Sequence, residues 1–349
     1  MVQKLPPRLA AHPTVRAVRE RPSQPPGVID AEWLRTICRE AGVDDVGFAR
    51  VDNPALASEV EHVEAALPGA VSYLSLVVKM NRDNVRSTAR SVANQEFHRS
   101  GEIMNEAAHR ITRVLQDAGH RVVNPSATFP MEMDRYPGRI WVVAHKPVAV
   151  AAGMGVMGIH RNVIHPRFGN FILLGTILVA SGITEYDVPL DYSPCLECKL
   201  CVAACPVGAI KKDGQFDFVA CSVHNYREFM GGFTDWVQTV ADSADGDEFR
   251  SRVTDSENAS MWQSLSFKAN YKAAYCLAVC PAGEEVIEPY LDDRKAFMEL
   301  VLKPLQDKQE TLYVLPGSAA EDHAVKRFPH KPVKHVGSGI KGVRAIPGG

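Results

Sequence analysis

The sequence predicts an α+β protein in two parts, a first domain of helices and strands followed by a cysteine-rich module. Three observations support this prediction. The 349 residues suffice for two domains, since a domain has roughly 150 residues. Apolar patterns typical of helices and of strands follow one another between residues 28 and 190. Seven of the eight cysteines then fall between Cys195 and Cys280.

The first domain is expected over residues 28–190, after a flexible N-terminal arm, residues 1–27, that is rich in Pro and Arg. Asp30 can cap a helix over residues 31–41, which Gly42 would end. Apolar residues from Ile103 to Leu115 indicate a long amphipathic helix that stops at Gly119. The remaining elements are a short buried helix at residues 148–152 and strands at residues 46–51, 72–78, 121–123 and 171–180.

Three further segments complete the predicted organisation. Residues 124–146 read as a loop insertion with a short strand at residues 139–144, because prolines and a Pro-Gly pair interrupt any longer element. The cysteine module is expected over residues 191–290, with a polar surface excursion near residues 242–258. Residues 291–349 predict one helix, residues 294–302, followed by an extended tail.

The charge and hydropathy of the chain argue against two classes of partner. Lys and Arg number 39 against 41 Asp and Glu, so no basic excess exists to attract a phosphate backbone, and nucleic acid is not expected. The longest apolar runs fall short of the roughly 20 residues that span a bilayer, and no secretory signal is present. We therefore expect a cytoplasmic protein with no membrane partner.

The first cysteine run carries the most specific signal in the chain. Cys195, Cys198, Cys201 and Cys205, followed by Pro206, have the spacing of the bacterial ferredoxin motif, in which three thiolates bind one cluster and the fourth binds its neighbour. Zinc is the alternative, but a zinc site needs four ligands in tetrahedral closure rather than this run with its terminal proline. Cys38 lies apart on the apolar stripe of a predicted helix and is expected to be a buried structural thiol.

The second cysteine run is incomplete. Cys276 and Cys280, followed by Pro281, repeat the end of the motif, but Ala273 stands where a full motif would have another cysteine. Cys221 offers a further ligand from upstream. By the crossover rule, the first cluster would be a 4Fe-4S cluster bound by Cys195, Cys198, Cys201 and Cys280, and the second would be bound by Cys205, Cys221 and Cys276.

Three thiolates leave the nature of the second cluster open. It is either a 3Fe-4S cluster or a 4Fe-4S cluster whose fourth iron takes water, a histidine such as His224, or a small ligand. The other alternative is that the second half of the module binds nothing, which would leave three cysteines chemically exposed beside a cluster.

From Ile29 to Pro281 the sequence resembles the corrinoid-dependent reductases, which comprise reductive dehalogenases and epoxyqueuosine reductase. The resemblance is carried, in order, by residues 29–51, the glycine-rich residues 152–166, Phe168-Gly169, Leu174-Gly175 and the cysteine module. It implies a nitroreductase-like domain that binds cobalamin without a lower protein ligand, and a ferredoxin-like two-cluster module that reduces its cobalt. An external electron donor such as ferredoxin or flavodoxin is implied as well.

The glycine-rich segment supplies the candidate cofactor-binding residues. Gly153, Gly155 and Gly158 would let the backbone approach a bulky cofactor closely, because no side chain intervenes. Tight turns are the alternative reason for these glycines. His160 and His165 flank the segment and are candidate contacts to a cofactor or substrate, although histidines in such places more often satisfy local backbone groups.

The sequence departs from this family at its proton donors. Dehalogenases have a tyrosine in the stretch that aligns with residues 97–104, and epoxyqueuosine reductases an aspartate near residues 124–126; neither residue is present here. Asp134 and Tyr136 in the loop insertion are the replacement candidates. The sequence thus predicts a reductase acting on an unidentified small molecule, with two alternatives: a non-catalytic protein that transfers electrons or handles cobalamin, and a reductase that uses a flavin such as FMN.

Overall fold

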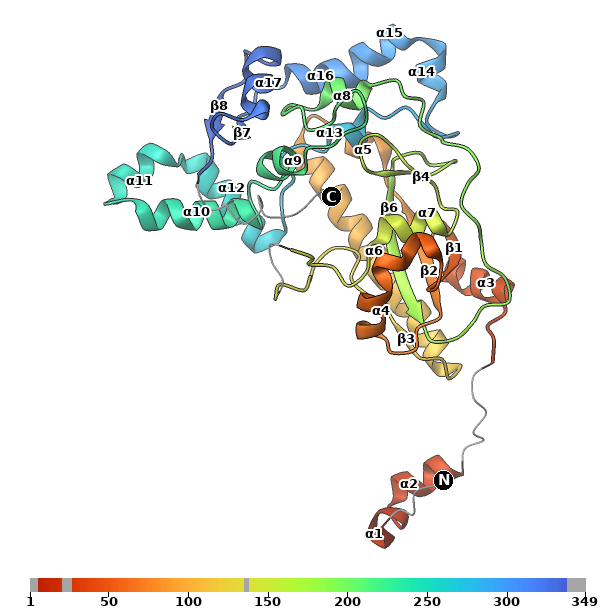
Figure 1. Cartoon of the computed structure of the whole chain (residues 1–349). Helices are drawn as coiled ribbons and strands as arrows, with labels where there is room; N and C mark the ends of the chain where they lie inside the picture. Colours follow the sequence, from red (N-terminus) through yellow and green to blue (C-terminus); the bar gives the residue numbers. More distant parts are fainter. Residues whose placement is uncertain (1–5, 21–26, 135–137, 338–349) are drawn as a thin grey trace.

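The computed structural model describes residues 6–20, 27–134 and 138–337 (Figure 1). Its first domain contains a four-stranded antiparallel sheet with the order β1-β2-β6-β3. The strands are β1 (Asp45–Arg50), β2 (Ser72–Lys79), β3 (Val122–Val123) and β6 (Ile172–Val179). Each predicted strand of this sheet is therefore present to within two residues at either end. The structure shows no strand at residues 139–144, where a short one was predicted.

Helices cover both faces of this sheet. On one face, α3 (Ala31–Ala41) and α6 (Arg90–Asp117) pack against Leu74 and Leu76 of β2. On the other face, α4 (Val60–Ala66), α7 (His145–Ala151) and the 3-10 helix η1 (Pro54–Glu59) pack against Tyr73 and Val77. Successive side chains of β2 thus alternate between two buried cores, as the period of a strand requires.

The predicted first helix begins and ends as its sequence indicates. Asp30 Oδ1 accepts a hydrogen bond from the Trp33 amide at 2.8 Å, and Gly42 ends the helix with φ 102°. Cys38 is buried in the core beneath this helix, as predicted. In contrast, α6 begins at Arg90, well before the apolar stripe that predicted it.

The cysteine module packs directly on the first domain. Its helices are α8 (Leu200–Ala204), α9 (Phe218–Asn225) and α13 (Tyr275–Ala278), and it is joined to the sheet domain through α5 (Arg82–Arg86) and the hairpin β4 (Val156–Met157) and β5 (Val163–Ile164). Val85 and Phe171 of the first domain belong to the same apolar core as Cys201 and Cys205. The two parts therefore pack around one common apolar core.

The polar excursion predicted near residues 242–258 lies within a helical projection. It consists of α10 (Gly231–Asp242), α11 (Gly246–Arg252) and α12 (Asp255–Phe267), which extend away from the sheet domain (Figure 1). Polar residues start two of these helices: Asp245 caps α11, and Thr254 forms a capping box with Glu257 in α12.

The two ends of the chain differ from the simple arms that were predicted. The described N-terminal residues form α1 (Pro7–Ala10) and α2 (Pro13–Arg19), which bury none of their side chains. Near the other end, α14 (Glu288–Asp292) and α15 (Arg294–Phe297) lead through a π-helical turn (Met298–Leu302) into α16 (Lys303–Asp307). The helix predicted at residues 294–302 thus continues beyond its expected end.

The expectation of an extended C-terminal tail was wrong for residues 312–335. Parallel strands β7 (Leu312–Val314) and β8 (Val333–His335) are joined by α17 (Ala319–Arg327). Leu312, Ala324 and Phe328 are buried, which ties this unit to the core of the cysteine module. Across the described residues, no helix is both long enough and apolar enough to cross a membrane.

Candidate metal centres

The seven clustered cysteines line two cavities in the two sets that their spacing predicts. Cys195, Cys198, Cys201 and Cys280 line the first cavity. Cys205, Cys221 and Cys276 line the second, which has a volume of about 530 Å³ and is called the second cavity below. Cys205 and Cys280 each follow the helix of one run and reach the cavity of the other, which is the crossover expected of paired clusters.

The chemistry and geometry of the two sets fit iron-sulfur clusters. Within the described residues, no three His, Cys, Asp or Glu side chains converge closely enough to hold a single metal ion. A cluster holds its cysteines farther apart, because each thiolate binds a different iron atom. Cavities lined by four and by three cysteine thiols are therefore compatible with clusters of this kind.

Local backbone geometry shows why Ala273 occupies a ligand position. Lys199, with φ 62°, lies between Cys198 and α8, and Cys201 is the second residue of that helix. Ala274, with φ 81°, likewise lies between Ala273 and α13, and Cys276 is the second residue of that helix. The two turns match residue for residue, so Ala273 corresponds to Cys198 but has no sulfur.

Burial and backbone donors shape the chemistry of the thiols. Burial raises the pKa of Cys276 and of Cys280 to about 12, so these thiols keep their protons unless a metal replaces them. The Ala209 amide donates a hydrogen bond to Cys205 Sγ at 3.2 Å. The side-chain amide of Asn162 donates to Cys276 Sγ at 3.9 Å. Such donors stabilise a metal-bound thiolate once it forms.

A lysine and an asparagine connect the first domain to the second cavity. Lys146, on α7, donates hydrogen bonds to the Arg161 carbonyl at 2.7 Å and to Asn162 Oδ1 at 2.9 Å. Its side chain is solvent-exposed and lines the second cavity. Desolvation by neighbouring protein atoms lowers the pKa of Lys146, while the nearby Cys276 and Cys221 oppose the shift. Asn162 thus links a cation to Cys276, a candidate cluster ligand.

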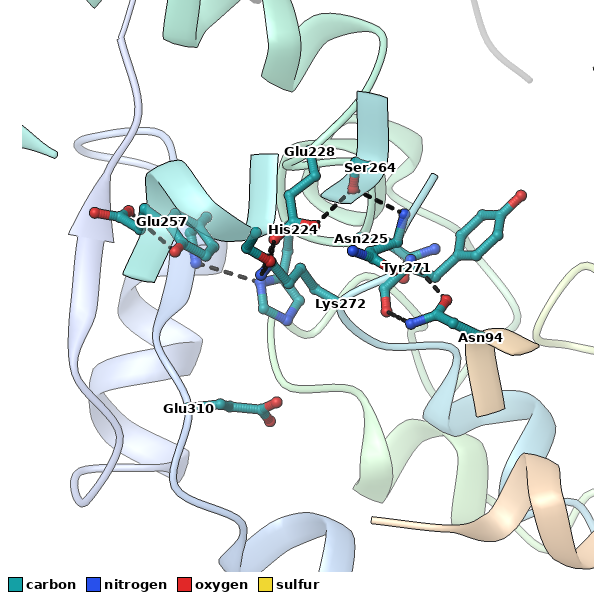
Figure 2. Close-up of polar contacts among 12 residues, drawn as sticks. Asn94, His224, Asn225, Glu228, Glu257, Ser264, Tyr271, Lys272 and Glu310 are labelled. Atoms are coloured by element: carbon teal, nitrogen blue, oxygen red, sulfur yellow. Dashed lines mark hydrogen bonds and ion pairs between the residues drawn. The ribbon is translucent and has the colours of Figure 1, made fainter. Parts of the chain in front are cut away.

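Polar side chains from two helices fix the segment that carries Ala273. Asn94 of α6 exchanges hydrogen bonds with the backbone of Tyr271 at 2.9 and 3.2 Å (Figure 2). Asn225 Oδ1 accepts from the Ala273 amide at 2.9 Å, and the Arg90 guanidinium donates to the Ala273 carbonyl at 2.8 Å. Both backbone polar groups of Ala273 are therefore satisfied by side chains.

His224 lies on α9, three residues after Cys221, and its ring lines the second cavity. Its Nδ1 accepts a hydrogen bond from the Tyr313 amide at 3.3 Å (Figure 2). Its Nε2 is buried and has no hydrogen-bond partner among the described residues. Burial lowers the pKa of His224 to about 4, so the ring is neutral at pH 7.

The two histidines of the glycine-rich segment have local partners. His160 lines both cavities, its Nδ1 accepts from the Asn162 amide at 3.1 Å, and burial with Lys146 nearby lowers its pKa to about 4. His165 Nε2 donates to Asp45 Oδ2 at 3.0 Å, and its Nδ1 accepts from the Arg167 amide at 3.1 Å. His165 therefore joins the segment to β1 and lines neither cavity.

Close packing accounts for the glycines of this segment. A side chain at Gly153 would place its Cβ 2.6 Å from the Val188 carbonyl oxygen, and one at Gly155 would place it 2.4 Å from that of Ile164. At Gly158 the Cβ would lie 2.7 Å from the His160 ring. The protein's own atoms thus require glycine at these positions, and contact with a cofactor stays a prediction.

Of the two candidate proton donors, only Asp134 lies in the described residues, and it does not line the second cavity. Asp134 is exposed and is not among the residues that line the cavity, whereas Thr128 and Met131 of the same loop are. Tyr136 lies outside the described residues. Sequence reasoning did not single out Lys146 or Asn162. Lys146 belongs to no motif, Asn162 lies within the glycine-rich residues 152–166 without a role of its own there, and only the fold brings them to Cys276.

Comparison with known proteins bears on the cysteine run first. Residues 188–211 match a family described as a 4Fe-4S binding domain, which confirms the predicted iron-sulfur motif. Two curated relatives are epoxyqueuosine reductases. The one from Staphylococcus aureus is 35% identical over 80 residues, covering 23% of this chain and 20% of the relative. The one from Cellulophaga algicola is 31% identical over 117 residues, covering 30% and 38%.

Solved structures give more distant likenesses. The catabolic reductive dehalogenase NpRdhA has a TM-score of 0.47 at 15% identity, covering 78% of this chain and 34% of that one. An epoxyqueuosine reductase crystallised with a modified tRNA stem loop has a TM-score of 0.43 at 18% identity, covering 85% and 81%. The chain spans between a fifth and two fifths of the length of the two curated relatives above. The sequence matches confirm that this chain resembles the epoxyqueuosine reductases and carries a 4Fe-4S binding segment.

Proposed function

We propose that this protein is an iron-sulfur reductase that passes single electrons through two clusters to a cofactor bound beside them. The observation that carries the proposal is the sorting of seven cysteines into two cavities, four in one and three in the other. Helices α8 and α13 pack against each other, and the cysteine run around each helix supplies ligands to both cavities. Two clusters held in this way are close neighbours, as electron transfer between them requires.

The resemblance points to a corrinoid as the terminal cofactor. Phe97 of α6, Leu173 of β6 and Met131 of the loop insertion bring apolar side chains from the first domain to the second cavity, where a flat macrocycle would pack against them. His160 and His224 already use Nδ1 as an acceptor, which fits a cofactor without a lower histidine ligand. A bound corrinoid would supply the strongly reducing cobalt centre.

In this proposal the chain's own residues bind the clusters, exclude water and set the charge around them. Asn162 and the backbone amides near Cys205 would stabilise the reduced clusters by donating to their thiolates. Lys146 adds a positive charge beside Cys276 and Cys221. An external ferredoxin or flavodoxin would supply the electrons.

Two alternatives differ in what receives the electrons. A protein that only reduces or handles cobalamin needs no proton donor, and the exposed position of Asp134 favours it. The second alternative replaces the corrinoid with a flavin such as FMN. Anaerobic purification followed by cofactor extraction and a visible spectrum separates corrinoid, flavin and clusters alone.

The clusters can be tested one at a time with cysteine variants. We expect the anaerobically reconstituted protein to be brown and to contain iron and sulfide close to two clusters' worth. Cys280→Ser should remove the first cluster and Cys221→Ser the second, while Cys38→Ser, in the core of the first domain, should retain both. Zinc without iron or sulfide would refute the proposal.

Cofactor and substrate are tested next. Cobalamin should be retained on gel filtration, and reduced clusters should change its spectrum; retention with no change would refute electron delivery. Single-turnover reactions can begin with ligands of two relatives, 3-bromo-4-hydroxybenzoic acid and an epoxyqueuosine-modified RNA stem loop. The charge balance of this chain predicts that the stem loop does not bind. Loss of turnover in Asp134→Asn would support Asp134 as the proton donor.

A further inference from the structure

We propose that the second cavity binds a small carboxylate ligand at the iron that Ala273 leaves without a thiolate. The inference rests on the proposed second cluster and adds a ligand class to it. It requires three things of the structure: a cluster position that no protein side chain fills, a hydrogen-bond donor that faces the same cavity, and a wall whose charge suits an anion.

The open position follows from the fixed place of Ala273. Its turn matches that of Cys198, so its methyl group points where a thiolate would otherwise bind. Asn225 and Arg90 hold its amide and carbonyl, and Asn94 holds the neighbouring Tyr271. Because side chains outside the cluster fix this segment, it does not shift to bring another ligand forward.

His224 is not the missing ligand. Its Nδ1 accepts from the Tyr313 amide, so the neutral ring carries its proton on Nε2. A protonated Nε2 has no lone pair for iron. This Nε2 is also buried away from the open space of the cavity, so it does not reach a group bound there.

Lys146 provides the hydrogen-bond donor and the positive charge. An ammonium group has three N-H donors, and in the described residues Lys146 uses two of them, on the Arg161 carbonyl and Asn162 Oδ1. The third is left for a ligand. Arg161 also lines the cavity, whereas no aspartate or glutamate among the described residues does. Glu228, beyond the wall, is already paired with Lys272.

These features select a small carboxylate. One oxygen would occupy the open coordination position, and the other would accept from Lys146. An apolar ligand would neither bind iron nor accept a hydrogen bond from Lys146. Cationic ligands would face Lys146 and Arg161. The ligand class is therefore defined by a negative charge, by two acceptor oxygens and by the ability to bind iron.

Glycolate is a suitable probe, read by electron paramagnetic resonance of the reduced, reconstituted full-length protein. In the native protein, glycolate should shift the signal of the second cluster, and ¹⁷O-labelled glycolate should broaden it. Ala273→Cys should abolish both effects because a thiolate takes the position. Lys146→Gln should weaken glycolate binding at least tenfold, and Lys146→Arg should restore it. Lys326→Gln, on the exposed face of α17, should bind as the native protein does.

The outcomes separate this inference from the function on which it rests. Iron and sulfide for only one cluster would refute the two-cluster proposal itself. Two clusters with no response to glycolate would overturn the carboxylate site and leave the reductase proposal standing. A response that persists in Ala273→Cys would place the ligand away from the iron and also overturn the inference. His224→Phe should still show an exchangeable iron; a new loss of iron in that variant would identify His224 as the fourth ligand instead.

Discussion

Replacing Asn162 by leucine should lower the reduction potential of the proposed second cluster. The Asn162 side-chain amide donates to Cys276 Sγ, and its carbonyl oxygen accepts from Lys146. A donor to a cluster thiolate stabilises the reduced state, which carries more negative charge, and so raises the potential. Leucine has the same number of side-chain heavy atoms but neither donates nor accepts, so the change removes the hydrogen bond to Cys276 together with the one from Lys146.

The geometry sets the size of the effect. A hydrogen bond of ordinary strength contributes about 1 kcal/mol. For a one-electron couple, a tenfold change in equilibrium constant is about 59 mV or about 1.4 kcal/mol, so about 1 kcal/mol corresponds to about 40 mV. The distance of 3.9 Å is long, and the bond acts on both redox states. We therefore expect the potential to fall by about 20 to 40 mV.

Redox titration followed by electron paramagnetic resonance measures this shift for each cluster separately. Asn53→Ala is the control, because Asn53 caps the distant helix η1 through the Ala55 amide and its loss costs about 1 kcal/mol of stability without touching a cluster. The first cluster should keep its potential in both variants. An unchanged or higher potential for the second cluster in Asn162→Leu would refute the role of Asn162.

Two further predictions concern stability. Gly169→Ala should lower the free energy of unfolding in urea by about 3 kcal/mol, because φ is 64° and the new Cβ would lie 1.9 Å from the Ala282 carbonyl oxygen. Gly119→Ala is the control: its φ is 89° but the new Cβ would lie in open space, so the loss should be only about 1 kcal/mol. Equal losses in the two variants would refute the steric argument. Burial lowers the pKa of His145 below its ordinary 6.5, so the unfolded state binds the proton first and stability should fall as pH drops below 6.5. His145→Gln should flatten that part of the pH profile, and an unchanged slope would contradict the assignment.

The parts of the fold that the sequence predicted are those with strong local signals. Residues 72–78 and 171–180 are nearly continuous apolar runs, and β2 and β6 are the central strands of the sheet. The first half of α6 was missed because it has no apolar stripe. Its buried side chains include Arg90 and Asn94, which make polar contacts with the cysteine module instead of packing into the sheet domain. A helix whose buried face makes polar contacts lacks the apolar periodicity from which a helix is predicted.

The C-terminal unit was missed for a different reason. Strands β7 and β8 have three residues each, too few for an alternating pattern to stand out, and the Pro-Gly turn after β7 reads as a loop. Their pairing depends on contacts between residues 312 and 333, which no local pattern records. We expected an extended tail because of the amino-acid composition of this segment, whereas its actual structure depends on tertiary contacts.

The cysteine sets were predictable because the crossover rule assigns the last cysteine of each run to the other cluster. Of the cavity walls, His224 was named as a candidate ligand, but Lys146 and Asn162 were not, since only the fold brings their segments to the second cavity. Their arrangement also explains how the module tolerates alanine at position 273. The neighbouring segment is held by Asn94, Arg90 and Asn225 rather than by coordination, so losing one thiolate removes a ligand without releasing the backbone. Of these three side chains, Asn225 also lines the second cavity, whereas Arg90 and Asn94 hold the segment from outside it. The open iron position that we propose would therefore be fixed by the protein architecture and not by a fourth ligand.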